Sequence, residues 1–171
     1  MNRSIFVIAG VIAVAYIFAL SIQTSGSAQI GTSGKMDAKA AMITGAARAQ
    51  PHRLAVQVDV NDPATMNLAL NNVTNAAQHY SQIGQKVEIE VVTFGPGLHM
   101  LREDTSPVKA RIKSMSETMP EVTFSACGNT RENMTKAEAK EIPLITQATV
   151  TKSGVIRLME LQERGWSYLR P

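Results

Sequence analysis

Strand-like and helix-like segments alternate along residues 53–171, and this alternation leaves few architectures open to the chain. Short segments with the apolar content or period-two pattern of strands lie at 53–60, 86–94, 122–126, 146–150 and 166–169. Amphipathic patterns of helical period separate them, most clearly at 63–84, 108–119 and 153–164. Because strands joined by helices pair in parallel through right-handed crossovers, we expect a three-layer α/β/α domain. Its sheet should be mostly parallel, with about five strands.

Cap signals set the expected starts of two helices. Asp62 followed by Pro63 combines an N-cap acceptor with a proline at the first helical position, where its missing N–H costs nothing. Thr135 with Glu138 matches a capping box, which predicts that a short helix starts there, several residues after the third strand. Pro143 is expected to end this short helix.

The first helical pattern has an unusual polar face. Between Pro63 and Gln85 the chain contains no Asp, Glu, Lys or Arg. The face opposite the apolar stripe carries amides instead, at Asn67, Asn71, Asn75 and Gln78. Amides lose less than ions when they are desolvated, provided that they find hydrogen-bond partners. Two interpretations stay open: a polar surface helix, or a face that packs against another subunit or lines the functional site.

The N-terminus has the pattern of an export signal. Residues 5–20 form an uninterrupted apolar run that follows Arg3. A helix of that length is about 24 Å long, which is short of the roughly 30 Å hydrocarbon core of a membrane. Gly26 and Ala28 have the size and spacing of a signal-peptidase site, which predicts cleavage after Ala28. The alternative is an uncleaved membrane anchor through residues 5–22.

The chain therefore divides into three parts. Residues 1–28 are expected to be a signal peptide or anchor, 29–52 a flexible linker, and 53–171 the α/β domain. We expect the domain to be periplasmic or otherwise exported, with membrane contact only through an uncleaved N-terminal segment. The formal net charge of +3 on 171 residues is too small to favour nucleic acid as a partner.

Candidate site residues follow the first three strands. Ligands of open α/β sheets bind beyond the carboxyl ends of the strands. The residues expected there are Asp59 after the first strand, Gly95, Gly97 and His99 after the second, and Cys127, Gly128, Asn129 and Thr130 after the third. Glycines allow close approach of the main chain to a ligand. His99 is a candidate base or ligand, and Asp59 either orients a group in the site or caps a turn.

Cys127 is the only cysteine of the chain, which excludes an internal disulfide and a thiolate zinc cluster. Backbone N–H groups after it, or the N-terminus of a following helix, would stabilise a thiolate that acts as a nucleophile or carries transferable sulfur. A buried packing cysteine and a redox-sensing thiol are the alternatives. The nine methionines form no cluster with histidine, so neither a metal nor another cofactor is expected.

Four blocks of sequence carry a family resemblance. They are DPATMNLALNNVTN, VEIEVVTFGPGLHML, VTFSACGNT and GVIRLMELQERGWSYLRP, in this order. Together they resemble the DsrE/DsrF-like (YchN-like) family over nearly all of residues 53–171. The resemblance implies a three-layer domain that assembles as homotrimers or hexamers, in which a cysteine beyond a central strand carries persulfide sulfur. Cys127 matches that cysteine, and the surrounding motif is matched by Gly95, Gly97, Asn129 and Thr130.

The resemblance implies a sulfur-relay or sulfur-oxidation carrier, with activity that is at most sulfurtransferase-like. The relay members of the family are cytoplasmic, so an exported member requires a different sulfur donor and acceptor. Two other functions stay open from the residues themselves. One is a non-catalytic homo-oligomeric module that binds a small ligand or serves assembly, in which Cys127 is structural. The other is a protein that senses redox state through the Cys127 thiol.

Overall fold

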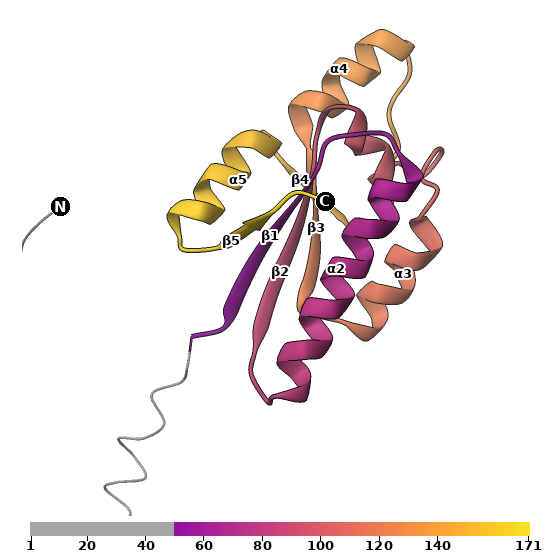
Figure 1. Cartoon of the computed structure of the whole chain (residues 1–171). Coiled ribbons are helices and arrows are strands. Elements are labelled where there is room, and N and C mark those ends of the chain that lie inside the picture. Colours follow the sequence, from indigo (N-terminus) through magenta and orange to yellow (C-terminus); the bar gives the residue numbers. More distant parts are fainter. Residues whose placement is uncertain (1–49) are drawn as a thin grey trace, which may run out of the picture. The chain divides into compact units, whose positions relative to one another are not determined.

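A computed structural model describes residues 50–171, which form a five-stranded sheet covered by helices on both faces (Figure 1). The strands are β1 (His52–Val58), β2 (Val87–Thr93), β3 (Val122–Cys127), β4 (Ala148–Thr151) and β5 (Ser167–Leu169). They lie in the order β4-β3-β2-β1-β5, and every neighbouring pair is parallel. The expected α/β fold class with a parallel sheet of five strands is confirmed.

The connections between the strands contain four α-helices and one 3₁₀-helix. They are α2 (Pro63–Gln82), η1 (Gly95–Leu101, the 3₁₀-helix), α3 (Lys109–Thr118), α4 (Gly128–Glu138) and α5 (Gly154–Glu163). The expected start of α2 is confirmed, because the Asp62 carboxylate accepts hydrogen bonds from the backbone N–H groups of Ala64 and Thr65. Pro63 then occupies the first turn of the helix.

The helices divide between the two faces of the sheet. In Figure 1, α2 and α3 cover one face and α5 lies on the other. The larger apolar core lies under α2 and α3, whereas α5 buries Leu158 and Leu161 against Ala55 and Val92. The strands β1 to β4 follow one another in one direction across the sheet, so right-handed crossovers put α4 on the same side as α2 and α3. The chain therefore leaves β3 toward one face and β4 toward the other. In open α/β sheets this change of direction opens a crevice at the carboxyl ends of the two strands concerned.

The structure corrects the expected helix after the third strand. Thr135 and Glu138 do not start a helix, because they lie in the second half of α4, which begins at Gly128. The helix ends where Ala139 adopts a left-handed conformation with φ of 50°. Cys127 is the N-cap residue, and its sulfur accepts a hydrogen bond from the Thr130 N–H. Since cysteine is not among the preferred N-cap residues, the sequence hides this helix start.

The uncharged polar face of α2 contacts another helix of the same chain. Arg111 of α3 donates hydrogen bonds to the side-chain oxygens of Asn67 and Asn71, at 3.1 and 2.7 Å. Asn75 and Gln78 are exposed. None of the four amides lies on the face of the sheet that carries α5. The interpretation that the polar face of α2 packs against another subunit stays a prediction.

Two predictions for the N-terminus fall on residues that the structure does not describe. The signal peptide or anchor expected over 1–28 lies wholly outside the described residues, and so does the linker up to residue 49. Among residues 50–171, no helix has both the length and the apolar character needed to span a membrane.

Candidate functional site: a cysteine between two helix starts

Cys127 is the last residue of β3 and lies where the loops after β3 and β4 meet. The residue is 4% exposed. The Asn129 N–H donates a hydrogen bond to the Lys152 carbonyl at 3.2 Å, which joins the two loops. A Cβ atom on Gly128 would lie 3.1 Å from the Thr151 carbonyl oxygen, so a larger residue would crowd this junction. Cys127 therefore sits beside the starts of both α4 and α5.

Donors from both helix starts surround the sulfur. The Thr130 N–H donates a hydrogen bond to Sγ at 3.4 Å, and the backbone N–H groups of Asn129 and Gly154 lie close enough to the sulfur to lower the pKa of the thiol. The Thr130 hydroxyl is a fourth donor. Its oxygen accepts a hydrogen bond from the Gly95 N–H at 2.9 Å, which leaves the hydroxyl proton free to donate to the sulfur.

These donors change the acidity of the thiol. Burial alone raises the pKa of Cys127, because it disfavours the charged thiolate. Hydrogen bonds from the Thr130 hydroxyl and from the N–H groups of Gly154, Thr130 and Asn129 outweigh burial and hold the pKa of Cys127 below its ordinary value. The N-terminal ends of two helix dipoles act in the same direction. The site is therefore built to stabilise a negative charge on sulfur.

Gly154 is a site residue that the sequence analysis missed. It is the first residue of α5, and a Cβ atom there would lie 2.9 Å from the Phe94 ring. Only a glycine lets α5 approach β2 closely enough to place this N–H group at the sulfur. A glycine three residues after the fourth strand, at the same edge of the sheet as Cys127, was the available signal.

The glycines after β2 are part of the site. Gly95 adopts a φ of 52°, a conformation that favours glycine, and its N–H group binds Thr130. Gly97 is buried against the end of β1, where a Cβ atom would overlap the backbone of Val58 and Asp59. The two glycines thus let η1 pack directly on the sheet beside the Cys127 loop.

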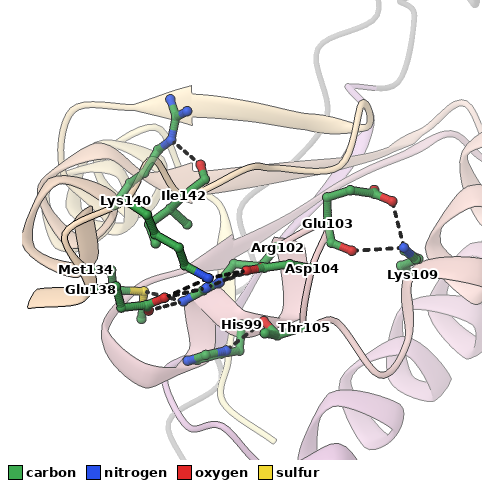
Figure 2. A network of polar contacts seen from close by, with 11 residues as sticks. His99, Arg102, Glu103, Asp104, Thr105, Lys109, Met134, Glu138, Lys140 and Ile142 are labelled. Atoms are coloured by element: carbon green, nitrogen blue, oxygen red, sulfur yellow. Dashed lines mark hydrogen bonds and ion pairs between the residues drawn. The ribbon is translucent and has the colours of Figure 1, made fainter.

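His99 and Asp59 have partners away from the sulfur. His99 Nδ1 lies 2.8 Å from Thr105 Oγ1, and Figure 2 shows the two side chains together. Asp59 forms an ion pair with Arg170 at 2.8 Å, which ties the C-terminus to the end of β1. His99 does share a shallow groove of about 420 Å³ with site residues; the groove is lined by Gly95, Pro96, His99, Thr130, Asn133, Met134 and Ala137. We therefore assign neither residue a direct role at the sulfur.

A second feature missed from the sequence is a buried ion pair beneath α5. Glu90 of β2 is 4% exposed and binds Arg157 through two contacts of 2.7 Å. Ser125 donates to the same carboxylate at 2.6 Å. Ser125 lies two residues before Cys127 on the same face of β3, so this cluster fixes α5 to the strand that carries the cysteine.

Within residues 50–171, no group of three or more histidine, cysteine, aspartate or glutamate side chains is placed to hold a metal ion.

Comparisons with known proteins bear on the fold. No family model matches the chain, and neither does any curated protein. Among solved structures, the chain is similar to MTH1491, a protein of unknown function from Methanobacterium thermoautotrophicum. The two are 29% identical with a TM-score of 0.60, over 70% of this chain and 99% of that one. BT1422 from Bacteroides thetaiotaomicron, also of unknown function, is 18% identical with a TM-score of 0.45, over 70% and 94%. The similarity to MTH1491 supports a Rossmann-like α/β fold for this chain.

Proposed function

We propose that the protein is a sulfur carrier that holds persulfide sulfur on Cys127, in a sulfur-relay or sulfur-oxidation process. The observation that carries the proposal is the set of donors from two helix starts around one buried sulfur. A thiolate attacks sulfur far better than a thiol does, and the same donors suit the anion of a persulfide. The resemblance of the Cys-Gly-Asn-Thr segment to DsrE/DsrF-like proteins agrees with this chemistry.

The proposed step needs a donor persulfide and no net oxidation. The Cys127 thiolate attacks the outer sulfur of the donor, and a new S–S bond forms on Cys127. The donor's own S–S bond breaks, and its electron pair leaves with the donor as a thiolate. Transfer to an acceptor thiolate repeats the step in reverse, with Cys127 as the leaving group.

The test is loading with sulfur, read by the intact mass of the full-length chain. After incubation with glutathione persulfide, wild type is expected to gain one sulfur atom, and a reducing agent should remove it. The Cys127→Ser variant should gain none, because the chain has no other thiol. A wild-type chain that keeps its unmodified mass, although a small alkylating reagent modifies Cys127, would rule the carrier role out.

A non-catalytic binding module remains the second candidate, with two observations in its favour. Cys127 is 4% exposed, which also suits a packing residue, and the groove of about 420 Å³ beside Thr130 could take a small ligand. In that case Cys127 resists alkylation in the native protein, and Cys127→Ser leaves ligand binding unchanged.

We also propose that the chain assembles as a homo-oligomer, a trimer or a hexamer. Val155, Ile156 and Met159 are each about half exposed on the outer face of α5, and the amide face of α2 has no charged residue. Such surfaces favour contact with another subunit. Light scattering of the purified chain should give three or six times its mass of 18.5 kDa, and a monomer would contradict the proposal.

A further inference from the structure

Helix α4 has little apolar attachment to the rest of the domain. None of its eleven residues is buried. A helix of this length is marginal in water without tertiary contacts, so its polar contacts, together with the packing of Met134 on the core, must keep it in place. Its position matters, because its first turn supplies the Asn129 and Thr130 donors to the Cys127 sulfur.

Arg102 provides the attachment at the far end of α4. This residue follows η1, and its side chain is 1% exposed although it carries a full charge. Its guanidinium group binds both carboxylate oxygens of Glu138, in the last turn of α4, at 2.5 and 2.9 Å. The same group also binds both carboxylate oxygens of Asp104, at 2.9 and 2.8 Å (Figure 2). The contact with Glu138 joins the end of η1 to α4, and the contact with Asp104 stays within the loop after η1; bidentate pairing is the strongest geometry available to an arginine.

Two of the contacts that fix α4 are made with η1 or the residue directly after it. Near its start, the Thr130 hydroxyl oxygen accepts the Gly95 N–H of η1. Near its end, Glu138 binds Arg102, eight residues and about 12 Å farther along the helix axis. Both partners belong to η1 or follow it directly, so the two contacts hold one helix against one rigid segment.

We infer that Arg102 is a positioning residue for Cys127: by holding the far end of α4 against η1, it fixes the first turn whose donors stabilise the sulfur anion. This inference rests on the proposed function for its biological meaning, although the geometry stands independently of it. Loss of Arg102 would let α4 fray or shift, and the donors of Asn129 and Thr130 would lose their alignment with the sulfur.

The charges around Arg102 keep the cluster intact at neutral pH. The groups that face it are Asp104, Glu138 and Lys140, which also contacts both carboxylates. Hydrogen bonds from Arg102 are the main reason why the pKa of Glu138 is lowered to about 2 and that of Asp104 lies below its usual range. Both carboxylates are depressed, so their contribution is complete above pH about 4 and is lost only as the pH falls toward 2. The cluster therefore does not titrate where a thiol does.

The experiment is a pH titration of the thiolate in the full-length chain, followed by its ultraviolet absorbance, with Cys127→Ser as the blank. In Arg102→Met, and to a smaller extent in Glu138→Gln, the titration midpoint should move to higher pH. The acid dissociation constant of the thiol should fall about three- to tenfold, the effect of weakening one or two hydrogen bonds to a charged group. Because absorbance needs no reagent to reach the sulfur, a change in exposure alone does not produce this result.

Two further variants make the titration decisive. Thr130→Val removes one donor directly and should move the midpoint at least as far. Lys109→Met is the control. It breaks the exposed ion pair between Lys109 and Glu103, next to Arg102, and should leave the midpoint unchanged because this pair does not involve α4. Glu138→Gln keeps the Arg102–Asp104 pair, so it carries the test if circular dichroism shows that Arg102→Met does not fold.

If Arg102→Met and Glu138→Gln both fold and both titrate with the wild-type midpoint, the inference is wrong. If Arg102→Met does not fold, a wild-type midpoint in Glu138→Gln alone overturns it. The outcome is separable from that of the loading test. A wild type that never accepts sulfur, with a midpoint that moves as expected, overturns the carrier role and leaves the positioning role of Arg102 standing. Normal loading of sulfur with an unmoved midpoint overturns the positioning role of Arg102 and leaves the carrier role standing.

Discussion

Replacing Gly97 with alanine is expected to lower the free energy of unfolding by about 3 kcal/mol or more. A Cβ atom there would lie 2.5 Å from the Val58 carbonyl carbon and 2.7 Å from the Asp59 nitrogen, and closer still to the Val58 oxygen. These neighbours are backbone atoms of a sheet strand and its exit, so no side chain can rotate to make room. Either η1 moves away from β1 or the strand end is displaced.

Gly84→Ala is the matched control for Gly97→Ala. Gly84 has a φ of 68° and nothing within 4 Å of an added Cβ, so alanine there costs only the left-handed conformation, about 1 kcal/mol. Denaturant unfolding of the full-length chain, followed by fluorescence of the single tryptophan, Trp166, compares the two variants. Equal losses in the two variants would show that η1 does not pack on β1 as closely as described.

Removal of the buried carboxylate beneath α5 is the second large effect. Glu90→Ala is expected to cost about 3 kcal/mol, because it leaves Arg157 and Ser125 without their shared partner. Glu160→Ala is the control, since Glu160 also lies near Arg157, at 3.6 Å, but is half exposed. That change should cost less than about 1 kcal/mol. A loss for Glu90→Ala no larger than that for Glu160→Ala would contradict a structural role for the buried pair.

The same pair predicts how stability depends on pH. Burial alone raises the pKa of Glu90, but hydrogen bonds from Arg157 and Ser125 outweigh it and hold that pKa below its ordinary value. A lowered carboxyl pKa gives stability that is complete above the unfolded value, about 4.3, and is lost as the pH falls through the folded one. Between pH 5 and pH about 3, the free energy of unfolding should therefore fall less in Glu90→Ala than in wild type, because the variant lacks the contribution of Glu90. Denaturant unfolding of both chains across this pH range measures the difference.

Much of the fold could be predicted from local patterns. The alternation of strands and helices was sufficient for a parallel sheet, because parallel neighbours need long crossovers. Asp62 and Pro63 marked the start of α2 correctly, since their chemistry acts within one turn. The order of the strands was not predictable from local patterns. The pairing of β5 with β1 depends on α5 crossing the opposite face of the sheet from α2 and α3, and no local pattern indicates the face that a helix covers.

The site was only partly predictable, for the same reason. Cys127 and the three residues after it form one continuous segment. Because this segment lies at the carboxyl end of a predicted strand, the sequence predicted the correct edge of the sheet for it. Gly154 reaches the sulfur from the other side of the crevice, and no local pattern joins two residues so far apart in sequence. The capping-box pattern at Thr135 misplaced the start of α4, although the donors of that start decide the acidity of the thiol.

Buried charges were the least visible part of the site. Arginine and glutamate are residue types that normally lie at the surface, and they are rarely buried unless they are paired. Nothing in the local sequence therefore indicated that Arg102 and Glu90 are buried. Their partners, Glu138 and Arg157, come from helices that follow much later in the sequence. Only the packing of η1 against α4, and of α5 against β2, brings these charges together.

We propose that the donors around Cys127 hold a sulfur anion that carries transferable sulfur. The most direct test is the intact mass of the protein isolated from its own cells without a reducing agent. We predict a species that is one sulfur atom heavier than the unmodified chain, that a reducing agent converts to the unmodified mass, and that is missing from Cys127→Ser. A wild-type chain found only with an unmodified thiol at Cys127, under conditions that preserve a persulfide on a control protein, would contradict the account.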